Sequence, residues 1–200
     1  MKPLDKLLFG LLFGLSFPLF FFLIAVLGFY LFQDYNVYYF VFTGIIIGIL
    51  TDILLLKKML RITLELPKWI IIGLYLFYNI CIYGMFMGFP VFNLGIGIIA
   101  GYYYGIKINH QNYPLKQIEQ IKKNVSLFTG FIMLLICISS ALIALTEKTI
   151  GLELQGMLGL GFQVTRGMVI AIILIGGTTL IITQYFLTKI AMTLTIKNKG

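Results

Sequence analysis

Long uncharged runs of apolar residues alternate with short polar segments along the chain. A helix needs about 20 mostly apolar residues to cross the hydrocarbon core of a bilayer. The runs therefore predict an all-α bundle with six transmembrane helices, at approximately residues 7–32, 37–56, 69–88, 92–106, 125–146 and 167–188. Because six spans and short loops occupy the sequence, we expect a single membrane domain over residues 1–200.

The third and fourth spans come from one stretch, residues 69–106, that contains no charged residue. The stretch is long enough to cross twice at about 1.5 Å per helical residue. Near its middle, the sequence Gly88-Phe89-Pro90 predicts a turn, because proline disfavours helix in the residue before it and glycine readily ends helices. A re-entrant element is the alternative.

The positive charges sort to one side of these spans. Only Lys148 and Arg166, among 15 lysines and arginines, fall on the opposite side. Since loops rich in lysine and arginine stay in the cytoplasm, we expect a multi-pass protein of the cell membrane with both termini cytoplasmic. An odd number of spans would break this alternation of charge.

Two segments between spans are expected to be more than plain loops. Apolar residues recur at helical spacing through residues 115–125, with lysines among them, which favours a helical lead-in to the fifth span over a separate surface helix. Residues 147–166 are apolar and rich in glycine. We expect a short helix there that packs on the bundle or lies in the outer interface.

The composition agrees with a membrane protein. Of 200 residues, 60% are hydrophobic and 11% are charged, with a mean hydropathy of +1.01, whereas a soluble domain carries about a quarter charged residues. The net charge is +8, but the basic residues gather at span ends. We therefore expect the lipid bilayer, and no nucleic acid, as their partner.

The sequence contains no complete catalytic or metal-binding motif. Its one histidine, His110, lies in a basic loop without a His-Glu or Cys-His cluster, and Cys81 and Cys137 form no CxxC pair. Intramembrane catalysis needs a nucleophile with a base, paired carboxylates or metal ligands. We therefore expect no enzymatic activity, no cofactor and no metal site.

Small residues form stripes along three spans, with four-residue spacing that lets helix backbones approach closely in lipid. The candidate helix-packing residues are Gly10 and Gly14 in the first span, Gly44 and Gly48 in the second, and Gly97, Gly101 and Gly105 in the fourth. With 21 glycines in 200 residues, some such spacing arises by chance. The same faces, however, also collect most of the polar residues within the spans.

Five polar residues inside the spans are candidates for an intramembrane site: Thr51, Asp52, Asn79, Thr183 and Gln184. Asn79 lies near mid-membrane, where an amide needs a partner on another helix or a cavity. An interhelical hydrogen bond is the favoured interpretation for it. Gln184 and Asp52 have comparable depths, so the five residues together could form a pocket open to the cytoplasmic half.

Asp52 is the most informative single residue, because a charged carboxylate at the bilayer centre costs about 2.5–3.5 kcal/mol. It shares a helical face with Gly44 and Gly48, so we expect it to point into the bundle. It precedes Lys57 by five residues, or about 7 Å at helical rise. A structural ion pair or hydrogen bond is slightly favoured over a functional role.

Two classes of function fit these features. In the first, the protein is a small-solute transporter or the membrane-embedded substrate-binding subunit of one. Six spans in 200 residues with a basic cytoplasmic side resemble the general layout of energy-coupling-factor substrate-binding components, which implies a solute-binding membrane subunit. In the second, it is a structural or assembly protein that docks a membrane-protein partner through glycine-lined helix faces. A polar cavity favours the first class, and a solid glycine-packed interior favours the second.

Overall fold

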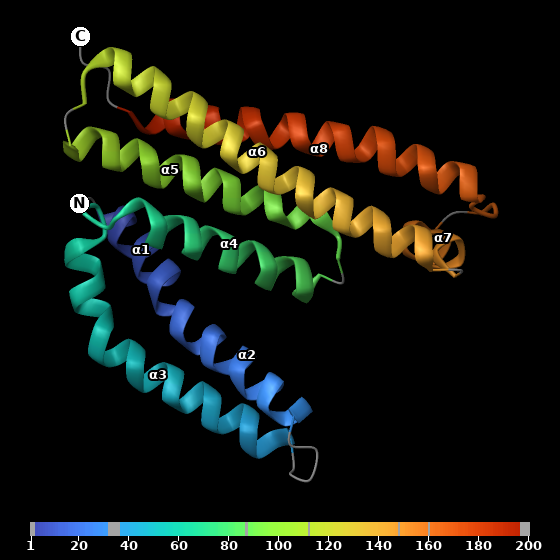
Figure 1. Ribbon diagram of the computed structural model, residues 1–200, viewed down its shortest axis with the longest axis horizontal. Helices are drawn as coiled ribbons and strands as arrows, with labels where there is room; N and C mark the ends of the chain where they lie inside the picture. The colour runs from blue at the N-terminus through green and yellow to red at the C-terminus, as the bar shows by residue number, and fades with distance from the viewer. Residues whose placement is uncertain are drawn as a thin grey trace. The chain divides into compact units, whose positions relative to one another are not determined.

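The computed structural model describes residues 3–31, 37–86, 88–111, 113–147, 149–159 and 161–196, which are all-helical apart from turns and connections. Figure 1 shows the elements: α1 (Pro3–Gly14), α2 (Ser16–Leu31), α3 (Val37–Ile62), α4 (Lys68–Met85), the 3-10 helix η1 (Pro90–Asn93), α5 (Leu94–Gln111), α6 (Leu115–Thr146), α7 (Ile150–Leu158) and α8 (Arg166–Thr195). Within these ranges, six helical segments are long and apolar enough to cross a membrane, with α1 and α2 forming one of them. This number confirms the expectation of six apolar helices.

The first predicted span is interrupted, because α1 ends at Gly14 and α2 begins at Ser16. Pro18 explains the interruption. A proline has no N–H to donate to the carbonyl four residues earlier, which is that of Gly14, and its ring crowds that carbonyl. The neighbouring backbone bonds survive, since Leu15 N donates to Leu11 O at 3.0 Å and Leu19 N donates to Leu15 O at 3.1 Å.

The chain divides into two compact units, Met1–Ile71 and Ile72–Gly200, called unit 1 and unit 2 below. In unit 1, α2 packs along α3, and glycine makes the close approach possible. A Cβ on Gly44 would lie 2.7 Å from the carbonyl oxygen of Phe21, and one on Gly48 would lie 2.5 Å from Pro18 Cα. The backbone of α2 therefore occupies the space that larger side chains on this face of α3 would need.

In unit 2, α8 packs along both α5 and α6 (Figure 1). The glycines of α5 again face a neighbouring backbone. A Cβ on Gly101 would collide with the carbonyl oxygen of Thr188, and one on Gly105 would lie 2.6 Å from Thr195 Cβ. The space beside these two glycines is therefore occupied by α8 of the same chain.

The turn between α4 and α5 lies at its predicted position. Gly88 has a φ of 78°, which is unfavourable for other residues, and Phe89 before the proline is extended with φ −85° and ψ 109°. The hydroxyl of Ser140 in α6 donates to the carbonyl oxygen of Gly88 at 2.9 Å. The hairpin is thereby attached to α6.

The two segments between spans also form the expected helices. The lead-in at residues 115–125 is continuous with the fifth span, because α6 is a single helix from Leu115 to Thr146. The segment 147–166 contains the short helix α7, which ends at Gly159 in a left-handed conformation with φ 61°. The location of α7 in the outer interface stays a prediction.

Several polar side chains are buried inside unit 2, and many apolar side chains lie on its surface. On α8, Gln184 and Thr188 are fully buried, whereas Leu174 and Ile175 are 64% and 70% exposed. Such a large exposed apolar surface is unfavourable for a folded domain in water, but it is not unfavourable in lipid. This arrangement agrees with helices that face acyl chains.

Candidate polar site in unit 2

An amide pair joins α4 to the start of α5. Asn79 is held by its own helix, since its Nδ2 donates to the carbonyl oxygen of Tyr75 at 2.8 Å. Asn93 reaches across from η1 and donates through Nδ2 to the Asn79 carbonyl oxygen at 2.9 Å and to Asn79 Oδ1 at 3.0 Å. The interhelical hydrogen bond predicted for Asn79 is present, and its partner is Asn93.

A second polar connection joins α5, α6 and α8. The Thr188 hydroxyl donates to the carbonyl oxygen of Gly97 at 3.2 Å and lies 3.0 Å from the hydroxyl of Thr129. The Thr129 hydroxyl also lies 3.1 Å from the carbonyl oxygen of Ser126, and its one proton can be donated either to this oxygen or to Thr188. All three of these hydroxyl residues are fully or almost fully buried. They cross-link three helices at a place where burial leaves no competing solvent partner.

Gln184 lies between these two polar connections. The Tyr75 hydroxyl is close enough to the side chains of both Asn79 and Gln184 to hydrogen-bond with each. The Tyr75 ring packs against Phe128 with ring centroids 5.7 Å apart. On its other side, the Gln184 amide lies against α5, where a Cβ on Gly97 would collide with Nε2. The absence of a side chain at Gly97 thus creates the space that Gln184 occupies.

We call these eight residues the polar core cluster: Tyr75, Asn79, Asn93, Gly97, Ser126, Thr129, Gln184 and Thr188. Not all of its polar atoms are paired. Apart from the contact of Gln184 with the Tyr75 hydroxyl, the buried polar atoms without a hydrogen-bond partner among the described residues are Nε2 and Oε1 of Gln184, the hydroxyl of Ser126 and Oδ1 of Asn93. Each buried unpaired group costs about 1–3 kcal/mol. A bound molecule that hydrogen-bonds to these groups would recover that free energy.

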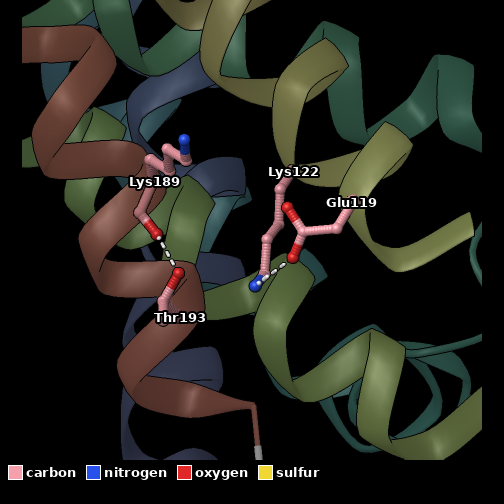
Figure 2. Close-up of polar contacts among 4 residues, drawn as sticks. All are labelled: Glu119, Lys122, Lys189 and Thr193. Carbon is pink, nitrogen blue, oxygen red and sulfur yellow. Dashed lines mark hydrogen bonds and ion pairs between the residues drawn. The ribbon is translucent and has the colours of Figure 1, made fainter. Parts of the chain in front are cut away.

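The polar core cluster carries no charged side chain, although basic residues flank it along the helices. Lys189 follows Thr188 directly, and Lys122 precedes Ser126 by one helical turn, about 6 Å. Lys122 forms an ion pair of 2.9 Å with Glu119, and the hydroxyl of Thr193 donates to the Lys189 carbonyl oxygen at 2.9 Å. Figure 2 draws both contacts. The cluster is therefore close to the basic end of α6 and α8.

The other predicted site residues lie outside this cluster. Thr183 is half-buried beside Gln184. Thr51 and Asp52 belong to unit 1, where the Thr51 hydroxyl donates to the carbonyl oxygen of its own helix at Ile47, at 2.8 Å. The Asp52 carboxylate lies against α1, with Oδ2 at 3.2 Å from where a Cβ on Gly14 would stand, and Oδ1 has no hydrogen-bond partner in the described chain.

Five cluster residues were not among the predicted site or helix-packing residues: Tyr75, Asn93, Ser126, Thr129 and Thr188. The sequence does contain a signal for the three hydroxyl residues Ser126, Thr129 and Thr188. Thr188 is one helical turn beyond Gln184 on the same face, and Ser126 and Thr129 are three residues apart, followed by Gly130. Small hydroxyl residues are common in lipid-facing spans as well, where they bond back to their own helix. Thr179 does so, since it is exposed and donates to Ile175 O at 2.7 Å.

No group of three or more metal-ligating side chains is found among the residues that the structure describes. Comparison with known proteins gives no match to a family model, a curated protein or a solved structure. The chemistry of the polar core cluster is therefore the main basis for assigning a function.

Proposed function

We propose that the chain is a multi-pass protein of the cell membrane with six spans and both termini in the cytoplasm. The apolar surface of unit 2 and the sorting of basic residues support this topology. In this orientation Ser126, Gln184 and Thr188 lie in the cytoplasmic half of the bundle, because Lys122 and Lys189 lie next to the cytoplasmic ends of the fifth and sixth spans.

We further propose that the protein binds a small polar solute at the polar core cluster, as a transporter or as the substrate-binding subunit of one. The observation that carries this proposal is Gln184, whose side chain is fully buried and, apart from the Tyr75 hydroxyl, has no hydrogen-bond partner among the described residues. In lipid, a buried glutamine with unused hydrogen-bonding capacity destabilises the fold unless a bound molecule supplies the missing hydrogen bonds. A polar solute supplies the missing hydrogen bonds.

The alternative is docking of a partner through glycine-lined faces. The glycine-packed helix contacts favour this class, but most of the glycines already face helices of the same chain. Gly44 and Gly48 face α2, and Gly101 and Gly105 face α8. Their stripes are occupied inside the chain and do not offer a free surface. Gly10, with nothing within 4 Å of its missing Cβ, is the exception among the predicted helix-packing glycines.

The test is to purify the protein in lipid nanodiscs and to identify any retained small molecule by native mass spectrometry. We expect a retained solute in the wild type and its loss in Gln184→Leu, which keeps the size of the side chain and removes its polar atoms. Thr179→Val on the same helix is the matched control, because this hydroxyl bonds only to its own helix, and it should retain the solute.

If the purified wild-type protein retains no solute, the thermal midpoint of the Gln184→Leu variant decides whether the cluster is only structural. A wild type without solute whose Gln184→Leu variant is more stable would show that the cluster is only structural, and the proposed function would then be wrong. Co-purification of a second membrane protein in the same experiment, without a solute, would favour the docking alternative.

A further inference from the structure

Asp52 lies on the face of α3 that packs against α1 and α2. Along this face, a Cβ on Gly44 or Gly48 would collide with the backbone of α2. Asp52 continues the same face one helical turn further on, and its carboxylate lies beside Gly14 of α1. Since all three positions of α3 face the same pair of helices, the carboxylate is directed into unit 1.

No basic residue of α3 faces this carboxylate. Lys57, Lys58 and Arg61 follow Asp52 by five, six and nine residues, which places them about 140°, 120° and 180° away around the helix. Oδ1 of Asp52 is buried and has no hydrogen-bond partner, and no ion pair of Asp52 is found among the described residues. Its own helix therefore leaves the carboxylate uncompensated.

The two helices packed against Asp52 bring no positive charge to it either. α2 contains no charged residue, and its titratable side chain, Tyr30, is in its last turn, far from the end that joins α1. In α1, Asp5 and Lys6 precede Gly14 by nine and eight residues, or about 14 and 12 Å at helical rise. An ionised Asp52 would thus hold an unpaired charge within a span, where such a charge is costly.

The break between α1 and α2 supplies a hydrogen-bond acceptor at the same place. Pro18 has no N–H to donate to the carbonyl oxygen of Gly14, and Oδ2 of Asp52 is 3.2 Å from where a Cβ on that glycine would stand. A carboxylate cannot donate to a carbonyl oxygen, whereas a protonated carboxyl group can. Protonation therefore removes the unpaired charge and gives the interrupted turn a donor.

We propose that Asp52 is a reversible proton-binding site within the spans, and that its protonated carboxyl group donates to the carbonyl oxygen of Gly14. The proton passes to a carboxylate oxygen from water or a buffer acid at the end of α3 that carries Lys57, about 7 Å away along the helix. It returns by the same route, and the carboxylate regains its negative charge. This site belongs to unit 1 and does not depend on solute binding at the polar core cluster.

Infrared difference spectra of the protein in lipid nanodiscs, recorded between neutral and alkaline pH, test the proposal. A protonated carboxyl group has a C=O stretch separate from the bands of a carboxylate. We expect this band at neutral pH, its loss at alkaline pH and its absence in Asp52→Asn. Glu65→Gln is the matched control, because Glu65 is an exposed carboxylate of the same unit, and it should keep the band.

A wild type without this band at neutral pH would overturn the proposal, and so would a band that persists in folded Asp52→Asn. If Asp52→Asn does not fold, the wild type assigns the band through dicyclohexylcarbodiimide, which adds to protonated carboxyl groups in apolar surroundings. We expect its adduct on Asp52 at neutral pH and not at alkaline pH, found by mass spectrometry of peptides. Adducts on other carboxyl groups without one on Asp52 would contradict the assignment.

Pro18→Ala tests the role of the Gly14 carbonyl oxygen. Alanine supplies the N–H that the proline lacks, so the carbonyl oxygen accepts within the helix and becomes a weaker partner for the protonated carboxyl group. We expect the band to be half lost at a pH at least about half a unit below that of the wild type. Pro67→Ala, at an exposed proline between α3 and α4, should leave this pH unchanged. An unchanged pH in Pro18→Ala would overturn the hydrogen bond to Gly14.

Discussion

Gln184 and Asn79 are two amides in similar surroundings with different chemical roles. Asn79 accepts from Asn93 and donates to the carbonyl oxygen of Tyr75, so its polar atoms are used within the protein. Gln184, on α8, has only the Tyr75 hydroxyl as a partner among the described residues. At the scale of the residue, burial alone does not identify a binding group. The unpaired hydrogen-bonding capacity of a buried side chain is the more specific sign.

Asp52 gives a prediction at the same scale. In Asp52→Asn, we expect a thermal midpoint equal to or higher than that of the wild type, because Oδ1 has no hydrogen-bond partner among the described residues and removal of the charge lowers the cost of burial. The measurement is thermal unfolding in detergent. A fall of several degrees would instead reveal a structural ion pair, since breaking one leaves the partner uncompensated.

At the scale of the element, close helix packing explains why α5 is rich in glycine. The face of α5 that carries Gly97, Gly101 and Gly105 meets side-chain or backbone atoms of α8 where a Cβ would stand, whereas Gly95 has nothing within 4 Å. The same helix therefore contains glycines that packing requires and one that it does not. Four-residue spacing distinguishes the two groups in this helix.

This difference predicts opposite effects of one substitution at two positions of α5. Gly101→Ala would force α5 and α8 apart, because its methyl group would collide with the backbone carbonyl of Thr188, and overpacking costs about 1–3 kcal/mol. Gly95→Ala should be neutral or stabilising by up to about 1 kcal/mol, through helix propensity alone.

Thermal midpoints of the two alanine variants in detergent check this. The Gly101 variant is expected to unfold at least about 2 °C below the Gly95 variant. Equal midpoints would show that α5 and α8 do not pack as closely as described.

At the scale of the whole molecule, the prediction concerns topology. Reporter fusions at Pro67 and at Gly200, which lies outside the described residues, should read cytoplasmic, and a fusion at Gln155 in α7 should read external. The physical reason is that loops rich in lysine and arginine are not translocated across the membrane, and this arrangement keeps nearly all of these residues in the cytoplasm. Finding Gln155 and Gly200 on the same side would contradict the six-span arrangement.

The sequence by itself determined the number and approximate positions of the long apolar helices, because a helix that crosses lipid needs a long apolar run and such runs can be read directly. It also determined the turn at Gly88 and the lead-in before the fifth span, where local backbone preferences decide the structure. It did not reveal the break at Leu15, although Pro18 was visible, since a proline in a span can either bend or interrupt a helix.

Only the tertiary structure decided which polar residues meet. Thr179, Gln184 and Thr188 look alike as polar positions of one span, yet Thr179 is exposed and the other two are buried. The face that α8 turns toward α5 and α6 makes this difference, and it depends on contacts between residues such as Gly97 and Gln184 that lie far apart in the chain. Local periodicity contains no information on such contacts, so only the tertiary structure shows that the residues of the polar core cluster lie together.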